Sequence, residues 1–196
     1  MWAMEQACKQ LAAWQKQYPE MGNITVAVNV SMRQLLQTSF FSQVRDILDS
    51  SGVIPRMVEL ELTETSAMAN PLQTMENLSM LKKLGLRLAL DDFGTGYSSL
   101  AYLQKLPIDI LKIDKAFVRS IGNNQSDMEI MRLMMALAHT LNLQTTAEGV
   151  ETFEQIHELK KMGCNLGQGF LFSAPLTAQE AEALICNSHR FPLVVV

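Results

Sequence analysis

Several features are scarce in this 196-residue sequence, and each absence argues against a class of protein. Three cysteines without a Cys-x-x-Cys pair favour neither a disulfide framework nor a zinc site, and they suggest a reducing compartment. A net charge of −4 provides no basic surface for nucleic acid, so DNA is not an expected partner. No apolar run is long enough to span a membrane and no signal peptide is visible, so we expect a cytoplasmic location.

Familiar catalytic motifs are missing as well. None of the histidines has a cysteine or carboxylate at metal-ligand spacing, and no serine or cysteine lies in a nucleophile-elbow context. The segment Gly94-Thr95-Gly96 is neither a dinucleotide fingerprint nor a P-loop. The sequence therefore predicts neither a histidine metal site, nor a serine or cysteine nucleophile, nor a glycine-rich nucleotide-binding loop.

The overall composition is that of an ordinary globular protein, with 48% hydrophobic and 18% charged residues. The length suits one domain with a substantial core, so we predict a single domain over residues 1–196, of which 187–196 form a C-terminal tail. The four methionines between residues 128 and 135 are expected to fill that core rather than to form a binding surface.

Strand and helix patterns alternate along the chain after a first helix at residues 2–17. Strands are predicted at 24–30, 58–64, 86–92, 108–114, 143–147 and 165–172. Helices are predicted at 39–50, 71–84, 98–105, 126–141, 152–162 and 177–186. This alternation indicates a parallel sheet, either doubly wound or closed as a β/α barrel.

The positions of the polar residues favour the barrel. Each predicted strand is mostly apolar but carries a polar side chain toward its C-terminal end: Asn29, Glu61, Asp91, Asp92, Lys112, Glu148 and Gln168. Residues that converge from many strands at that end are typical of β/α-barrel enzymes. A doubly wound sheet would instead concentrate them at one switch point.

The sequence centres on residues 91–100, which read Asp-Asp-Phe-Gly-Thr-Gly-Tyr-Ser-Ser-Leu. Because side chains alternate along a strand, Asp91 and Asp92 start on opposite faces, and both reach one site only if the chain bends there. Gly94 and Gly96 are expected to supply that bend. A simpler interpretation is an aspartate cap followed by a glycine turn.

Four of these polar side chains form an all-oxygen set suited to Mg²⁺ or Mn²⁺: Asn29, Glu61, Asp91 and Asp92. Asp91 could bridge two ions, and a two-metal site stabilises both the attacking and the leaving oxygen of a phosphoryl displacement. Lys112 could orient a water or neutralise a phosphate, and Glu148 could bind metal or activate water. Taken singly, each residue also has a structural interpretation, such as a salt bridge between Glu61 and Lys112.

These residues lie in short segments whose order is informative. The segments are Asn29-Val30-Ser31, Glu61-Leu62-Thr63-Glu64, residues 91–100, Leu111-Lys112-Ile113-Asp114, Ala147-Glu148-Gly149-Val150-Glu151 and Gln168-Gly169-Phe170. In this order, along nearly the whole chain, they resemble the EAL-domain family of cyclic-di-GMP phosphodiesterases, which act in bacterial second-messenger signalling. The resemblance implies an α/β fold, a TIM-like β/α barrel, that hydrolyses cyclic di-GMP to linear pGpG with Mg²⁺ or Mn²⁺.

The resemblance also implies a role for each matching residue. The implied metal ligands are Asn29, Glu61, Asp91 and Asp92. The implied catalytic residues are Lys112, which would hold the water, Glu148, which would support the metal site, Asp92, and Glu64, which would anchor the Asp-Asp loop. Gln168 and Glu151 would bind substrate. In the family the loop that corresponds to Asp91–Leu100 also contributes to dimerisation, so a homodimer is a possible partner arrangement.

The sequence departs from the family pattern at two points. The strand with the Glu-Ala-Leu signature, which supplies a metal-binding glutamate, is absent, and the first two strands and first helix of the barrel are expected to be missing. Asn165 stands where the family usually has aspartate. An alternative prediction is therefore a weak or inactive truncated module that binds cyclic di-GMP or a protein partner, or that is completed by another copy.

Overall fold

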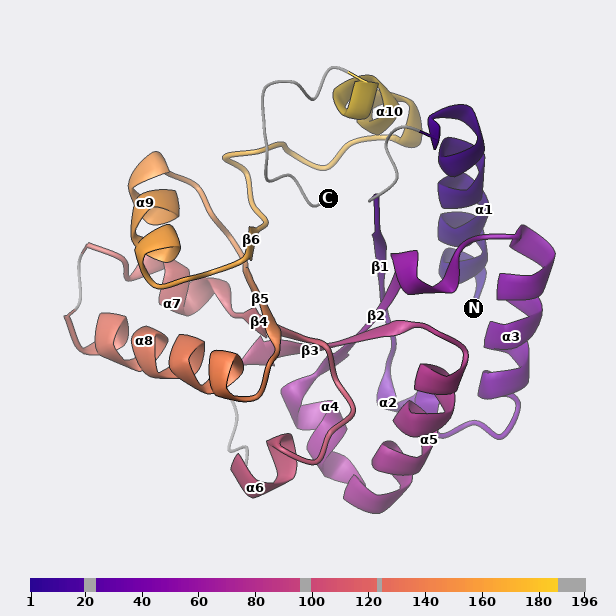
Figure 1. Cartoon of the computed structure of the whole chain (residues 1–196), viewed down its shortest axis with the longest axis horizontal. Coiled ribbons are helices and arrows are strands. Elements are labelled where there is room, and N and C mark those ends of the chain that lie inside the picture. The colour runs from indigo at the N-terminus through magenta and orange to yellow at the C-terminus, as the bar shows by residue number, and fades with distance from the viewer. Residues whose placement is uncertain (20–23, 96–99, 123–124, 187–196) are drawn as a thin grey trace. The chain divides into compact units, whose positions relative to one another are not determined.

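The computed structural model describes residues 1–19, 24–95, 100–122 and 125–186. It separates into two compact units, the first built from residues 1–91 and 96–109 and the second from residues 92–95 and 110–196. Each unit alternates strands with helices (Figure 1). None of the described helices combines the length and the apolar character needed to cross a membrane.

The first unit contains a parallel sheet of β1, β2 and β3. Its elements are α1 (Trp2–Gln17), β1 (Val26–Asn29), α2 (Met32–Leu35), α3 (Phe40–Ser51), a 3₁₀ turn (Pro55–Met57), β2 (Val58–Thr63), α4 (Glu64–Ala69), α5 (Pro71–Lys83), β3 (Arg87–Phe93) and α6 (Leu100–Leu103). Helices α1 and α3 lie side by side (Figure 1). β2 is buried along its first five residues, as expected for a parallel strand covered on both faces.

The second unit contains a parallel sheet of β4, β5 and β6. Its elements are β4 (Ile110–Ile113), α7 (Lys115–Arg119), α8 (Gln125–Thr140), β5 (Gln144–Ala147), α9 (Phe153–Lys161), β6 (Leu166–Gly167) and α10 (Ala178–Cys186). All four methionines of α8 are buried, which confirms that they fill the core. All four residues of β4 are buried too, so Lys112 lies within an otherwise apolar strand.

The alternation of parallel strands and helices is confirmed, but short helices appear that the apolar periodicity did not predict. They follow β1, β2 and β4 as α2, α4 and α7. Each begins at a side-chain cap: Ser31 accepts from the Gln34 amide, Thr63 from that of Ser66, and Asp114 from that of Ala116. Caps of this type were the available sequence signal, since helices of four to six residues are too short to show a hydrophobic period.

The last strand is shorter than predicted, because β6 covers only Leu166–Gly167. Beyond it the chain turns, with the amides of Phe172 and Ser173 donating to the Gly169 carbonyl. Gly169 lies directly against the backbone of Val150, where a Cβ atom would overlap main-chain atoms. The strand therefore ends because the chain turns against the segment that follows β5.

The tripeptide Glu182-Ala183-Leu184 lies in helix α10, not on a strand. None of the described strands carries a Glu-Ala-Leu sequence. The helix predicted at 98–105 lies partly outside the described residues, which show α6 over residues 100–103. The tail predicted at 187–196 lies wholly outside them.

Candidate active site

In the first unit, three of the predicted metal ligands lie on one face of the sheet. Asn29 pairs in register with Glu61, and Glu61 pairs with Ala89. Since register partners in parallel strands point to the same side, and Asp91 is two residues beyond Ala89, these three oxygen-bearing side chains share a face. Glu61 and Asp91 are 5% and 8% exposed, whereas Asn29, at the end of β1, is exposed. The backbone thus arranges them as expected from the sequence.

The bend after Asp91 begins earlier than predicted, at Asp92, before the chain reaches Gly94. Asp92 itself adopts a left-handed conformation with φ of 55°, which non-glycine residues rarely adopt but which aspartate tolerates better than most. The Thr95 amide and hydroxyl donate to the Asp92 carbonyl at 3.3 and 2.8 Å and close the turn. The strict alternation that would place Asp92 on the far face is therefore broken at Asp92. Gly96 lies outside the described residues.

Packing as well as backbone conformation requires a glycine at position 94. Its φ is 97°, and a Cβ atom there would overlap the side chains of Met134 and Phe117. Helices α7 and α8 thus pack directly onto the loop that follows the aspartates. The prediction that Gly94 enables the turn is confirmed, with packing as an additional cause.

The second unit holds a buried ion pair. The Nζ atom of Lys112, on β4, lies 2.6 Å from Oε1 of Glu148, the residue that follows β5. The Lys112 side chain is only 4% exposed. A lysine at that depth requires a charged partner, because an isolated ammonium group would lose most of its hydration energy. The amide of Glu148 donates to the Ile113 carbonyl at 3.0 Å, which extends the pairing of β5 with β4 to the glutamate.

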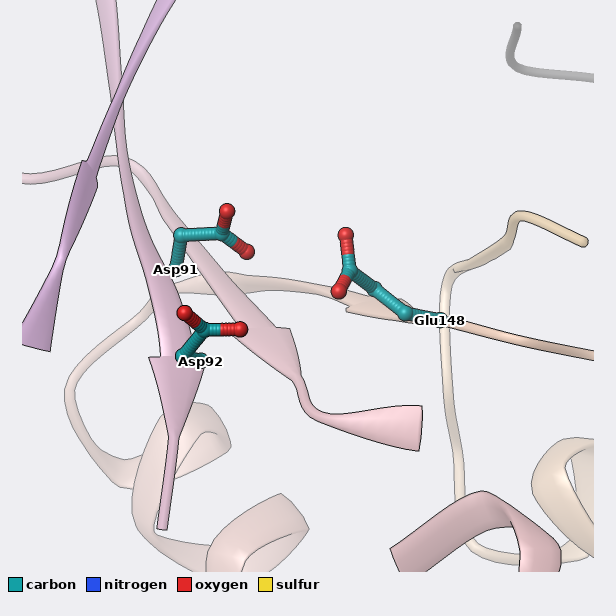
Figure 2. Close-up of side chains that lie close together, drawn as sticks. All are labelled: Asp91, Asp92 and Glu148. Carbon is teal, nitrogen blue, oxygen red and sulfur yellow. The ribbon is translucent and has the colours of Figure 1, made fainter. Parts of the chain in front are cut away.

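A second carboxylate faces Glu148 within the same unit. One oxygen of Asp92 lies within 4.8 Å of one oxygen of Glu148, and Figure 2 shows the two side chains directed toward each other. The figure also labels Asp91, the residue directly before Asp92 in β3. Carboxylate oxygen atoms at this spacing fit the coordination shell of a hard divalent cation.

The two predicted substrate-binding residues flank the segment that carries Glu148. The amide of Gln168 donates to the Ala147 carbonyl at 2.8 Å, and the amide of Val150 donates to the Gln168 carbonyl at 2.9 Å. Main-chain bonds therefore place Gln168, which is exposed, beside residues 147–150. Glu151 lies 3.4 Å from the guanidinium group of Arg119, and its side chain is 44% exposed.

Sequence comparison places this geometry in a known family. The family model described as the EAL domain matches residues 1–175. The chain belongs to the EAL domain family. It is 42% identical to the cyclic di-GMP phosphodiesterase NbdA of Pseudomonas aeruginosa over 97% of its own length and 24% of that protein. It therefore spans about a quarter of that curated relative.

Solved structures of EAL proteins share the fold. One is the phosphodiesterase MucR in complex with cyclic di-GMP, which matches with a TM-score of 0.87 and 37% identity over 92% of this chain and 72% of that chain. A second is Klebsiella pneumoniae BlrP1 in complex with manganese and cyclic di-GMP, with a TM-score of 0.77 and 31% identity over 89% of this chain and 45% of that chain. The β/α-barrel fold class predicted from the sequence is thereby confirmed.

The structure shows what Asn165 does at the position where the EAL family usually has aspartate. Its Oδ1 atom accepts hydrogen bonds from the Thr145 amide at 2.8 Å and from the Thr145 hydroxyl at 3.1 Å. One oxygen receives both bonds, so an aspartate carboxylate and an asparagine amide serve equally in this contact. The contact ties the start of β6 to β5, and the substitution leaves that link in place.

Two residues complete the description of the EAL site. Glu64 begins α4 and is 1% exposed, but residues 96–99 of the Asp91–Leu100 loop that it was predicted to anchor lie outside the described residues. Gln155 was not predicted to matter and is buried beneath the segment that carries Glu148. The pattern Thr152-x-x-Gln155, which is that of a capping box, was the signal that could have drawn attention to it.

Proposed function

We propose that this chain provides the catalytic part of a metal-dependent phosphodiesterase that hydrolyses cyclic di-GMP to linear pGpG. The observation that carries the proposal is the group formed by Lys112, Glu148 and Asp92, at the C-terminal ends of strands where β/α barrels place their active sites. We infer the substrate, cyclic di-GMP, from the cyclic-di-GMP phosphodiesterases among its relatives.

The donor set fits a divalent cation. The proposed ligands are the oxygen-bearing side chains Asn29, Glu61, Asp91 and Asp92, with Glu148 supporting them. Mg²⁺ and Mn²⁺ prefer such hard oxygen ligands over nitrogen or sulfur. When bound, such ions would neutralise the non-bridging phosphate oxygens and acidify a water. The manganese complex of BlrP1 supports this choice of cofactor.

The chain's own residues would bind and orient the reactants. In the overall reaction the oxygen of a water attacks one phosphorus, the bond from that phosphorus to the 3′ oxygen breaks, and the 3′ oxygen takes up a proton. Lys112, held in place by Glu148, would donate a hydrogen bond to the water or to a phosphate oxygen. Gln168 and Glu151 would contact the nucleotide, and Glu64 would anchor the Asp91–Leu100 loop.

A homodimer formed through residues 91–100 and a cytoplasmic location are parts of the same proposal. The family resemblance supports the first. The second rests on the cysteines, since Cys8, Cys164 and Cys186 are all free. The competing proposal is a module that binds cyclic di-GMP or a protein partner without turnover.

The test is hydrolysis of cyclic di-GMP by the full-length gene product, followed by chromatography of pGpG with Mn²⁺ present. We expect turnover that disappears in Asp91→Asn. The 196-residue chain is assayed beside it, because turnover there would show that these residues suffice. Binding of cyclic di-GMP by calorimetry without any turnover would reject the enzyme and favour the binding module.

A further inference from the structure

We propose that Gln155 is a positioning residue for the active site: its buried amide fixes the segment 148–152 and thereby sets the position of Glu148. This inference rests on the proposed phosphodiesterase function. Gln155 does not reach the proposed reacting atoms; it acts through the backbone of residues that do. It lies on the first turn of α9 and is 8% exposed.

The Gln155 amide group contacts three backbone groups at once. Its Oε1 atom accepts from the amide of Glu151 at 2.7 Å and from the amide of Thr152 at 3.0 Å. Its Nε2 atom donates to the Val118 carbonyl, in α7, at 3.2 Å. One buried side chain therefore joins the start of α9, the segment before it and α7, with Oε1 accepting two of the bonds and Nε2 donating the third.

The segment held by Gln155 has little freedom elsewhere. Gly149 has a φ of 65°, and a Cβ atom there would overlap the Lys115 side chain. On the other side, Val150 donates to the Gln168 carbonyl and accepts from the Leu171 amide. Removal of the Gln155 bonds would free the Glu151 and Thr152 amides, and the C-terminal half of the segment would lose its main-chain anchor to the first turn of α9. Glu148 begins that segment, and its Oε1 atom must stay 2.6 Å from Lys112 to keep the ammonium group paired.

Two substitutions separate the parts of this contact. Gln155→Glu keeps an oxygen that accepts from Glu151 and Thr152, as in the usual capping box, but cannot donate to Val118. Gln155→Met preserves length and apolar volume and loses all three bonds. The matched control is Glu180→Met, because Glu180 closes the equivalent capping box at Thr177 in α10 and makes no described bond to residues 148–152.

The experiment measures hydrogen exchange and turnover in the full-length gene product. In Gln155→Met we expect exchange of the Glu151 and Thr152 amides to accelerate at least about tenfold while β4 remains protected. We expect kcat to fall roughly 10- to 100-fold and the affinity for Mn²⁺, measured by electron paramagnetic resonance, to weaken. Gln155→Glu should recover much of both, and Glu180→Met should match the wild type.

The outcomes distinguish this inference from the proposed function. Wild-type protein without turnover would reject the phosphodiesterase, and the exchange and Mn²⁺ measurements would then decide the role of Gln155. Unchanged local exchange in Gln155→Met would overturn the positioning role. An equal loss of turnover in Gln155→Met and Glu180→Met would also overturn it, because the effect would then be a general loss of helix capping.

Discussion

Two lysine–carboxylate pairs of nearly equal length stand at opposite ends of strands in this molecule. In the first unit, Lys82, near the end of α5, lies 2.7 Å from Asp109, the residue directly before β4. In the second unit, Lys112 lies 2.6 Å from Glu148, where β4 and β5 end. The side chains of the first pair are 33% and 32% exposed, and those of the second are 4% and 18% exposed.

The partners of each pair support the different roles that we propose for the two pairs. Lys82 also donates to the Leu86 carbonyl at 3.3 Å, and Asp109 accepts from the Leu88 amide at 2.8 Å. These bonds connect α5 and Asp109 to the start of β3, so this pair stabilises the fold. Glu148 instead faces a second carboxylate, that of Asp92. Distance alone does not separate the two pairs; our assignment of Lys112 and Glu148 to the active site is a proposal that rests on the neighbouring carboxylate and on their place at the strand ends.

The largest expected effect separates the two lysines. Lys112→Met should lower kcat for cyclic di-GMP by roughly 10²- to 10³-fold, since it removes a charged donor from the proposed reaction centre. Lys82→Met should leave turnover per folded molecule unchanged. Both are measured by chromatography of pGpG, with the folded fraction taken from circular dichroism. Equal losses in the two variants would remove the distinction drawn between the pairs.

The second-largest effect is expected on the free energy of unfolding, at the Lys82–Asp109 pair. Asp109→Ala should lower the free energy of unfolding by about 1–3 kcal/mol, because it leaves the Leu88 amide without its described acceptor. Asp109→Asn keeps an acceptor oxygen and loses only a half-exposed ion pair, so its cost should stay below about 1 kcal/mol. Urea denaturation measures both. A loss of the same size in the two variants would show that the ion pair, rather than the backbone bond, supplies the stability.

The smallest effect is expected at a surface pair on α9. Lys161 lies 2.7 Å from Glu158, and its hydrogen bond is the main reason that the pKa of Glu158 is lowered. A lowered carboxylate pKa contributes stability above the unfolded-state pKa and loses it as the pH falls through the folded-state pKa. In Lys161→Ala the pKa of Glu158 should rise, as read by NMR titration, while the melting temperature at neutral pH should not change measurably. A clear fall in melting temperature would mean that exposed pairs matter more here than the comparison assumes.

The sequence predicted the features that follow from periodicity. The helix at residues 2–17 and the strand–helix alternation need only local hydrophobic patterns, and both are confirmed. The family resemblance added the fold class. The common face of Asn29, Glu61 and Asp91 follows from alternation and parallel register, so it too could be predicted.

Other features depend on contacts between segments that are distant in sequence. The left-handed Asp92 is held by a turn packed under Met134 and Phe117, and local propensity does not specify it. β6 is short because Gly169 meets Val150. Gln155 is recognisable as a cap, but its bond to Val118 spans α7 and α9 and appears only in three dimensions.

One matched pair of substitutions tests the central claim most directly. Glu148→Gln and Asp109→Asn make the same chemical change, carboxylate to amide, in the two ion pairs. Turnover of cyclic di-GMP per folded molecule of the full-length gene product should fall at least about 100-fold in Glu148→Gln and stay within about twofold of wild type in Asp109→Asn. Equal turnover in the two variants, or a greater loss in Asp109→Asn, would contradict the assignment of Lys112 and Glu148 to the active site.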